Sequence, residues 1–534
     1  MSLASRSKRL VYLTHRWTGI AGCLLMLIWF VSGIVMLYVG YPKLTPWERL
    51  AALPELDARG CCVWLHDAVG DPAGMPDAVV LTSIAGAPAY VVKAGGELRV
   101  YDGGTGQDKS APVSAEEAMR AAARFAATQH TPNSDSTPEA RASLKNDPSS
   151  ERPLHALDIT YHGLIDEDRW THSGGLDAHR PLHKVDVHGA KAATLYVSSR
   201  TGQVVLDASV SQQRWNYVGA WLHWLYMFRS SSVDPVWTWV VIVLSFVGTV
   251  SAISGVCVGL WRWRFGGRYK SGSRSPYREP WMKWHHVAGL LFGGFVCTWI
   301  FSGLMSMNPE GVFSPKQRPN QSAYAGDRQI PAGPLGDPAM IITALNAEGF
   351  RPAELAWHSL GGRAYVLAHD RRARTRIVRE QNGSLAVDQT WQPEQVIPAA
   401  RRLFNAPTAR EELVTEHGPY YYQRHPEAMN GALVRGLPAL RVDFLDPDRT
   451  RVYIDLNTGL VASSVSSQAR VGRWLFYFLH SWDTPGLLQA GAARDVVLIL
   501  LSLGGIVVCI AGIVIGWRRL RRNTRTARTK RPGA

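Results

Sequence analysis

The amino-acid sequence contains four apolar runs that are each long enough to cross the hydrocarbon core of a bilayer. They cover about residues 18–39, 236–260, 287–307 and 496–517, and a crossing helix needs roughly 20 apolar residues. We therefore predict a membrane protein with four transmembrane helices. The first run is longer than the apolar core of a signal peptide, and no Ala-x-Ala-like cleavage site follows it, so we expect this helix to be retained.

The chain repeats itself at two fixed offsets, which predicts two tandem copies of one membrane module. At an offset of 270, five residues recur: His15, Gly19, Trp29, Ser32 and Gly33 correspond to His285, Gly289, Trp299, Ser302 and Gly303. At an offset of 257, a second set recurs: Tyr196, His223, Gly255 and Gly259 correspond to Tyr453, His480, Gly512 and Gly516. Each copy therefore carries histidines at corresponding helix ends.

The net charge of +15 lies almost entirely in three short segments next to the apolar runs. Residues 1–16, 261–284 and 517–534 together carry +18, and the rest of the chain is slightly acidic. This is the positive-inside pattern, which predicts that the three segments and both termini are cytoplasmic. The pattern argues against a nucleic-acid partner and favours contact with anionic lipid headgroups. A solvated basic tail explains the C-terminal segment equally well.

The expected order of segments follows from these runs and from one length argument. His223 to Gly259 spans 36 residues, about 54 Å as a continuous helix, which exceeds a bilayer core of about 30 Å, so a separate interfacial helix must precede the second crossing. We expect a cytoplasmic N-terminus (1–16), transmembrane helix 1 (17–39), a periplasmic domain (40–212), an interfacial helix (213–229), transmembrane helix 2 (236–262), a basic cytoplasmic loop (263–284), transmembrane helix 3 (285–307), a second periplasmic domain (308–468), a second interfacial helix (469–483), transmembrane helix 4 (494–517) and a basic cytoplasmic tail (518–534).

Both periplasmic domains are predicted to be α+β. Short strand-like runs bounded by turn residues predict strands at 89–92, 97–101, 184–187, 194–198, 364–368, 375–379, 439–444 and 451–455. Helical patterns cover 114–127, 339–348 and 393–404. Cys61 and Cys62 are adjacent in the first domain, and because neighbouring cysteines rarely bridge each other, we assign no disulfide.

Several of these motifs resemble the PepSY-associated transmembrane family. They are the helix-opening His-Arg-Trp-x-Gly with a later Ser-Gly, the domain ending Tyr-x-x-x-x-Thr-Gly, and the pairs Leu222-His223 and Leu479-His480. The resemblance covers nearly the whole chain, and within it the two small extramembrane domains resemble PepSY domains. It implies a multi-pass protein of the bacterial inner membrane linked to iron uptake. Some members resemble haem-containing ferric-siderophore reductases.

The four repeated histidines predict two haem sites. The topology puts His15 and His285 on the cytoplasmic side and His223 and His480 on the periplasmic side. Two neutral imidazoles on each side would hold one haem iron by bis-histidine ligation, which suits electron transfer. No Cys-x-x-Cys-His occurs, so we expect two non-covalent b-type haems. The alternative is that these histidines lie at the membrane interfaces with their ring nitrogens in contact with water.

Other residues are candidates for the surroundings of these sites. His286 is adjacent to His285 and is an alternative ligand or a supporting partner, although the offset favours His285. Glycines would let helices or a macrocycle approach closely, as at Gly19, Gly22 and Gly289. Four tryptophans are candidates for packing on the porphyrin: Trp17, Trp29, Trp221 and Trp299.

Histidines and arginines of the periplasmic domains are candidates for contacting a substrate. Six histidines lie within 155–188, namely His155, His162, His172, His179, His183 and His188. Their spacing matches no zinc template, which favours solvated side chains. At an offset of 255, His162 and Arg169 correspond to His417 and Arg424, and we predict that these four contact an anionic substrate or haem propionates.

The predicted function is that of an oxidoreductase: a dihaem electron-transfer protein that reduces a periplasmic ferric siderophore or other ferric chelate. The cytoplasmic segments are short and contain no Gly-rich dinucleotide fingerprint, so the electrons would come from a cytoplasmic partner or from quinol. The alternative function is a non-enzymatic membrane accessory for binding or transport, whose PepSY-like domains hold a metal or a protein.

Overall fold

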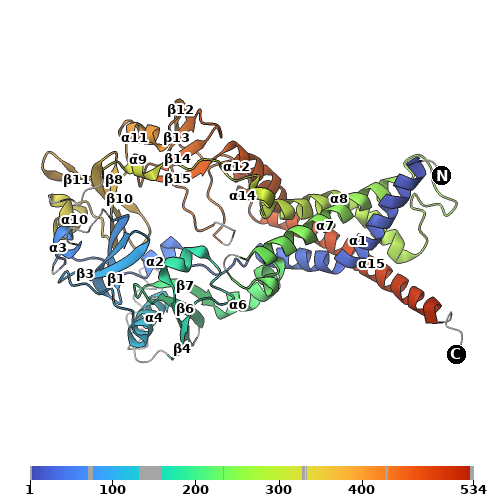
Figure 1. Cartoon of the computed structure of the whole chain (residues 1–534), viewed down its shortest axis with the longest axis horizontal. Coiled ribbons are helices and arrows are strands. Elements are labelled where there is room, and N and C mark those ends of the chain that lie inside the picture. The colour runs from blue at the N-terminus through green and yellow to red at the C-terminus, as the bar shows by residue number, and fades with distance from the viewer. Residues whose placement is uncertain are drawn as a thin grey trace, which may run out of the picture.

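The computed structural model describes residues 3–59, 61–69, 76–130, 158–189, 191–231, 234–327, 331, 333–426, 428 and 431–528. Four long helices form one end of the molecule, and three β-sheets form the other (Figure 1). Both ends of the chain lie at the end of the helix bundle that points away from the sheets. The candidate His155 lies outside the described residues.

The bundle consists of α1 (Leu3–Met36), α7 (Pro235–Arg262), α8 (Pro280–Ser306) and α15 (Ala492–Arg528). All four contain a segment long and apolar enough to cross a membrane, so the four predicted transmembrane segments are present as four candidate membrane-spanning helices. Both α1 and α8 pack against α7 and α15. Both α7 and α8 begin with an acidic N-cap residue followed by proline. The side chains of Asp234 and Glu279 accept hydrogen bonds from backbone N–H groups of the first turn, which stabilises these helix starts.

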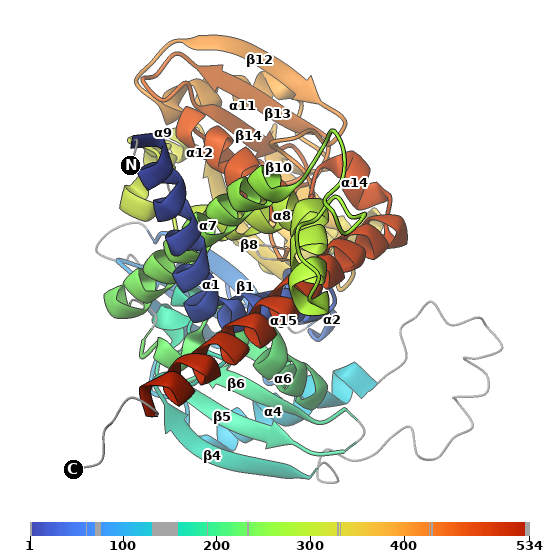
Figure 2. The same ribbon diagram turned by 90° about the vertical axis from the view of Figure 1, so that its right-hand side faces the viewer.

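Two four-stranded antiparallel sheets lie on opposite sides of the bundle axis (Figure 2). The first contains β4 (Ile159–Ile165), β5 (Leu182–Val187), β6 (Ala193–Ser198) and β7 (Val204–Ser209), and α4 (Ala115–His130) packs on it. The second contains β12 (Thr408–Val414), β13 (Ala439–Phe444), β14 (Arg451–Asp455) and β15 (Leu460–Val465). Its core also includes side chains of α11 (Pro393–Ala400) and η7 (Arg401–Leu403). Each sheet therefore buries one apolar face under a helix, as α+β domains do.

A third sheet of seven strands joins the two halves of the chain. Its order is β11-β10-β9-β8-β1-β2-β3, with β1 (Ala78–Ile84), β2 (Ala87–Ala94), β3 (Glu97–Asp102), β8 (Glu354–Leu360), β9 (Arg363–His369), β10 (Thr375–Gln381) and β11 (Ser384–Asp388). The junction is antiparallel and pairs Val79 with Trp357 and Leu81 with Leu355. The two extramembrane regions are thus joined by one sheet. Without the pairing of β1 with β8, each of these strands would be an edge strand with unpaired backbone groups.

All eight predicted strands lie within observed strands, and the three predicted extramembrane helices are present as α4, α10 (Pro338–Ala347) and α11 with η7. The remaining short elements are α2 (Pro46–Ala51), α3 (Leu65–Val69), η2 (Gly174–His179), η5 (Pro309–Gly311), α9 (Gln321–Ala325), η6 (Pro334–Gly336) and α14 (Pro485–Gln489).

Short helical turns connect the two four-stranded sheets to the bundle. After β7 come α6 (Val210–Asn216), the π-helical segment η3 (Tyr217–Trp221) and η4 (Tyr226–Phe228). After β15 come α12 (Ser467–Gly472), the π-helical segment η8 (Arg473–Phe478) and α13 (Leu479–Ser481). Left-handed backbone interrupts the first series at Leu225 (φ 54°), just before η4, and ends the second series at Trp482 (φ 49°). Each series is therefore separate from the long helix that follows it.

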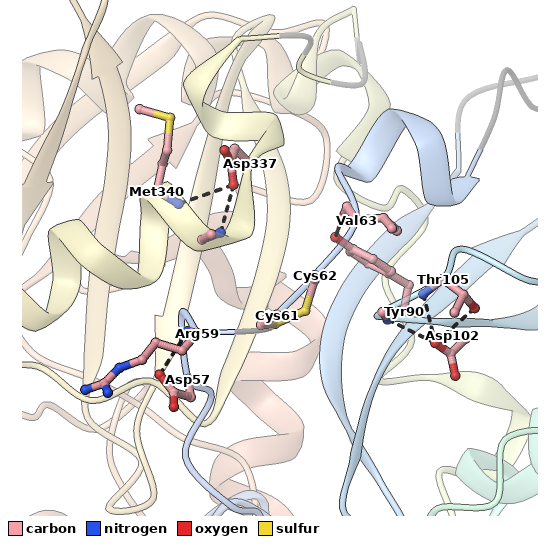
Figure 3. The surroundings of a disulfide bond; sticks show 12 residues. Asp57, Arg59, Cys61, Cys62, Val63, Tyr90, Asp102, Thr105, Asp337 and Met340 are labelled. Atoms are coloured by element: carbon pink, nitrogen blue, oxygen red, sulfur yellow. Dashed lines mark hydrogen bonds between the residues drawn. A yellow bond between two sulfur atoms is a disulfide. The ribbon is translucent and has the colours of Figure 1, made fainter.

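A disulfide joins Cys61 to Cys62 (Figure 3). The assignment of no disulfide from the sequence was therefore wrong. Adjacent cysteines bridge only where the backbone between them folds back, and here their Cα atoms lie 3.3 Å apart across a cis peptide bond. Both side chains pack against the core of the seven-stranded sheet, close to Val63, whose carbonyl accepts a hydrogen bond of 2.7 Å from Tyr90.

Candidate cofactor site

One pair of histidines lies toward the end of the bundle that carries the chain termini. His15 on α1 and His285 on α8 have their ring centres 6.1 Å apart, with an angle of 30° between the ring planes. Nδ1 of His15 lies 3.1 Å from the carbonyl oxygen of Ser251 on α7, and Nδ1 of His285 lies 3.0 Å from that of Val508 on α15. Because a carbonyl only accepts, both Nδ1 atoms carry the proton, and Nε2 keeps its lone pair.

A second pair lies at the other end of the bundle, next to the extramembrane sheets. The ring centres of His223, which follows η3, and His480 in α13 are 5.9 Å apart, with 75° between the ring planes. Nδ1 of His223 lies 3.0 Å from Oγ of Ser32 on α1, and Nδ1 of His480 lies 3.0 Å from Oγ of Ser302 on α8.

The two serine hydroxyls determine which nitrogen of each outer histidine carries the proton. Ser32 directs its hydroxyl to backbone carbonyls of its own helix, at 2.7 Å from Ile28, and Ser302 does the same at 2.9 Å from Trp299. A hydroxyl has one hydrogen, so each Oγ accepts from Nδ1–H of its histidine. Within the described part of the chain, no hydrogen bond reaches Nε2 of any of the four histidines.

The two pairs are separated by most of the thickness of a membrane. Ser32 follows His15 by 17 residues on the same helix, which corresponds to about 25 Å along the helix axis. The outer pair is neutral, since burial lowers the pKa of His223 to about 3 and that of His480 to about 4. Neutral imidazoles with an unprotonated Nε2 are the form of histidine that binds metals.

A glycine lies beside each of the four rings, and at Gly255 an added side chain would clash with the imidazole. A Cβ atom at Gly255 would lie 2.7 Å from Cε1 of His15, and one at Gly512 would lie 3.4 Å from Cε1 of His285. At the outer pair, Cβ atoms at Gly33 and Gly303 would lie 3.8 and 3.9 Å from Cε1 of His223 and His480. At Gly289, which was predicted to allow a close approach, an added Cβ would meet no atom of the described residues within 4 Å.

The other residues predicted near these sites have different roles. Both nitrogens of His286 are engaged, Nδ1 with Ser275 at 2.8 Å and Nε2 with the carbonyl of Gly259 at 2.9 Å, which leaves His285 as the partner of His15. The indole of Trp29 donates to the carbonyl of His223 at 2.9 Å, and so supports the outer pair. The remaining predicted tryptophans and glycines are placed as follows: Trp299 is buried against Phe30, Trp17 is half exposed, Trp221 packs against Tyr217, and Gly19 and Gly22 face Ser251 and Met26.

The four predicted substrate contacts lie in different surroundings. His162 on β4 pairs with Asp186 at 2.8 Å, His417 bonds to the carbonyl of Arg435 at 3.0 Å, and Arg169 lies over the ring of Tyr217. Arg424 forms an ion pair of 2.9 Å with the buried Asp483. The remaining histidines of 155–188 that the structure describes also have partners: His172 with Glu167, His179 with Ser198, His183 with Tyr161 and His188 with Thr160.

Sequence reasoning missed two sets of groups at these sites. The first is the pair of carbonyls at Ser251 and Val508, which accept from His15 and His285. Their positions differ by 257, so the repeat offset could have indicated them. The second is the ion-pair cluster around Asp483, for which the corresponding position in the first half is Tyr226. No local pattern indicates that cluster.

A pocket opens next to the junction between β1 and β8 and is lined from both halves of the chain, including Asp77, Tyr324, Trp357 and His358. These strands belong to the end of the molecule away from the bundle (Figure 1), so the pocket does not adjoin the histidine pairs.

The fold and the sites define a multi-pass membrane protein with extramembrane α+β regions and a histidine pair toward each end of its helix bundle. The family model described as the PepSY-associated TM region matches residues 12–374, and the chain belongs to this family. The match includes three of the four paired histidines and ends before His480. Comparison with curated proteins gives no match.

Proposed function

We propose that the two histidine pairs hold two b-type haems and that the protein carries electrons outward across the bacterial inner membrane to a ferric chelate. When bound, a haem iron held by two imidazoles supplies a one-electron redox centre that is closed to exogenous ligands. His15 and His285 would hold the inner group, and His223 and His480 would hold the outer one.

The observation that carries this proposal is the matched geometry of the two pairs. Histidine nitrogens bind a metal ion at about 2.0–2.1 Å, which separates the ring centres of two opposed imidazoles by roughly 6 Å, and the pairs measure 6.1 and 5.9 Å. All four rings are oriented through Nδ1 by a carbonyl or a hydroxyl, as metal-bound histidines are. The residues present therefore fit a bis-histidine haem at each end.

Charge supports the proposed orientation. The three basic segments carry +18. Within the described residues they form the first turns of α1, the connection between α7 and α8 and the last turns of α15, and this is the end of the bundle at which α8 begins with His285 in its second turn. Under the positive-inside rule this end faces the cytoplasm and the sheets face the periplasm. The inner pair would then receive electrons from a cytoplasmic donor or from quinol, and the outer pair would lie below the extramembrane regions.

The proposed acceptor is ferric iron bound to a chelator with hard oxygen ligands. Reduction to the ferrous ion weakens such a complex, because the softer ion is held less tightly by oxygen, and so frees iron for import. Arg169 and His162, on the extramembrane side, are the proposed contacts for the anionic chelate.

Two measurements test this function. An absorbance spectrum of the purified protein should show two b-type haems per chain. The protein is then reduced chemically without oxygen, and haem reoxidation is followed after addition of ferric chelates. We expect a chelate to reoxidise the protein faster than buffer does, and His223→Ala or His480→Ala to slow the reaction. Reoxidation no faster than in buffer with every chelate would indicate a different acceptor.

The alternative is a membrane accessory that binds a ligand without redox chemistry. The pocket at the junction of β1 and β8, with Trp357 and Tyr324 in its wall, is the observation that favours it. A purified protein that contains no haem would support this alternative and rule out the electron-transfer function.

A further inference from the structure

A buried ion-pair cluster is built around Asp483, three residues after His480 of the outer histidine pair. Asp483 is 2 % exposed and receives two arginines. Nη1 of Arg473 lies 2.8 Å from its Oδ1, and Nη2 of Arg424 lies 2.9 Å from its Oδ2. The hydroxyl of Tyr422 donates to the same Oδ2 at 2.6 Å. Two guanidinium groups thus share one carboxylate, which leaves an excess of one positive charge.

The excess charge is held close to His480 by the elements that carry the cluster. Asp483 follows His480 by three residues, and the guanidinium of Arg424 lies 4.6 Å above the ring of Tyr477, three residues before His480. Arg424 is therefore anchored on both flanks of the histidine. Its side chain is only 13 % exposed, so water screens its charge weakly.

This cluster distinguishes His480 from the other three paired histidines. His15, His285 and His223 are oriented by neutral groups only, namely two carbonyls and a serine hydroxyl. In the first half of the chain, Asn216 and Tyr226 occupy the positions that correspond to Arg473 and Asp483 at the offset of 257.

We propose that Arg424, positioned by Asp483, raises the reduction potential of the outer haem above that of the inner haem. This inference rests on the proposed function, since it requires a haem between His223 and His480. A nearby positive charge favours the reduced state of a redox centre, because reduction removes one positive charge from it. The unequal charge would make the outward direction of electron transfer the favourable one.

Potentiometric titration of the purified full-length protein, followed by haem absorbance, tests the inference without any acceptor. We expect Arg424→Gln to lower the potential of one haem and to leave the other unchanged. Arg424→Lys, which keeps the charge, should restore the wild-type value, and Asp483→Asn should shift the same potential upward. The potential should thus fall in Arg424→Gln and rise in Asp483→Asn. Opposite shifts of this kind indicate an effect of charge, because a loss of packing has no reason to reverse its sign between the two variants.

Two further variants make the result specific. His15→Ala, which should retain only the outer haem, is combined with Arg424→Gln to show which potential moves. Arg401→Gln removes an equal charge from an exposed ion pair with Glu411 in the same half of the chain and should change neither potential. Unchanged potentials in Arg424→Gln protein that contains both haems would overturn the inference, whereas a wild-type protein without haem would overturn the proposed function itself.

Discussion

Oγ of Ser32 on α1 lies 3.0 Å from Nδ1 of His223, which comes 191 residues later in the chain. The same distance separates Ser302 from His480. Each serine donates its hydroxyl hydrogen to a carbonyl of its own helix, so its oxygen can only accept a hydrogen bond from the histidine. The serines therefore fix the orientation and the tautomer of both outer imidazoles, which leaves Nε2 available for a metal.

Removal of one serine should weaken the outer site only. We expect Ser32→Ala to lower haem retention at that site by about 10–100-fold, the usual cost of losing such a supporting partner. The measurement is haem loss to apomyoglobin, followed by absorbance. Ser306→Ala is the matched control, because Ser306 lies on α8 and its hydroxyl donates to the carbonyl of Gly303 in its own helix. Equal retention in Ser32→Ala and wild-type protein would show that the hydrogen bond is dispensable.

Substitution of a paired histidine should remove one haem. We expect His285→Ala to contain about half of the wild-type haem, because bis-histidine ligation fails when either imidazole is lost. His286→Ala should keep both haems, since both nitrogens of His286 are engaged in hydrogen bonds to protein groups. The pyridine haemochrome assay gives the ratio of haem to protein. The reverse outcome, with haem lost only in His286→Ala, would reassign the ligand.

A methyl group at Gly255 should displace the imidazole of His15. The added Cβ would lie 2.7 Å from Cε1 of the ring, well inside van der Waals contact, and the ring is held against the same helix by the bond of its Nδ1 to the carbonyl of Ser251. We expect Gly255→Ala to lose the inner haem and keep the outer one. Gly294→Ala on α8, where an added Cβ meets no atom within 4 Å, should bind haem normally.

Much of the fold could be predicted because its signals are local. The four crossings follow from unbroken apolar runs, and strands such as β13 and β14 follow from alternation over five or six residues. The strands β1 and β8 were missed, and with them the junction between the two halves. Val80 pairs with Ala356, and no local pattern indicates a pairing between residues so far apart in the chain.

The histidine pairs illustrate the same difference between features that the sequence indicates and features that appear only in the folded chain. Repeat offsets singled out His15, His223, His285 and His480, and the structure brings them together as two pairs. The offsets contain no signal for groups that occur in one half only. Asp483 corresponds to Tyr226, so the cluster that binds Arg424 was visible only once the chain was folded.

Reporter fusions should show the orientation of the bundle. A cytoplasmic reporter fused after residue 270, in the basic loop, should be active, because positively charged segments of short loops stay inside. Fusions near residues 110 and 380 should be active with a periplasmic reporter. A periplasmic result at residue 270 would contradict the proposed direction of electron transfer, while leaving the histidine geometry unaffected.

The ion pair between Arg49 on α2 and Glu354 on β8 should lock the two halves of the extramembrane region together. It is bidentate, with distances of 2.6 and 2.8 Å, and Glu354 is 5 % exposed. Glu354→Gln removes the charge and weakens both hydrogen bonds, which costs about 1.5–3 kcal/mol for bonds of this kind. Thermal unfolding of the purified protein at neutral pH should therefore have a lower midpoint in the variant.

The effect of Glu354→Gln should depend on pH. Burial raises the pKa of Glu354, but the hydrogen bonds and charge of Arg49 outweigh burial and hold that pKa below its ordinary value. A carboxyl with a lowered pKa in the folded state stabilises fully above its ordinary pKa, and the contribution disappears as the pH falls through the lowered value. The difference in midpoint between wild type and variant should thus be largest above about pH 5 and should vanish in stronger acid.

Two comparisons complete this test. The pKa of His369, which lies near Glu354, is also lowered by burial, so acid destabilises both proteins as this side chain becomes protonated. Only the difference between wild type and variant therefore reports on Glu354. Glu411→Gln breaks the more exposed pair with Arg401 and should leave the midpoint nearly unchanged at every pH. If the two variants unfolded at the same temperature, the junction between the halves would depend on the pairing of β1 with β8 and on apolar packing, with no contribution from this ion pair.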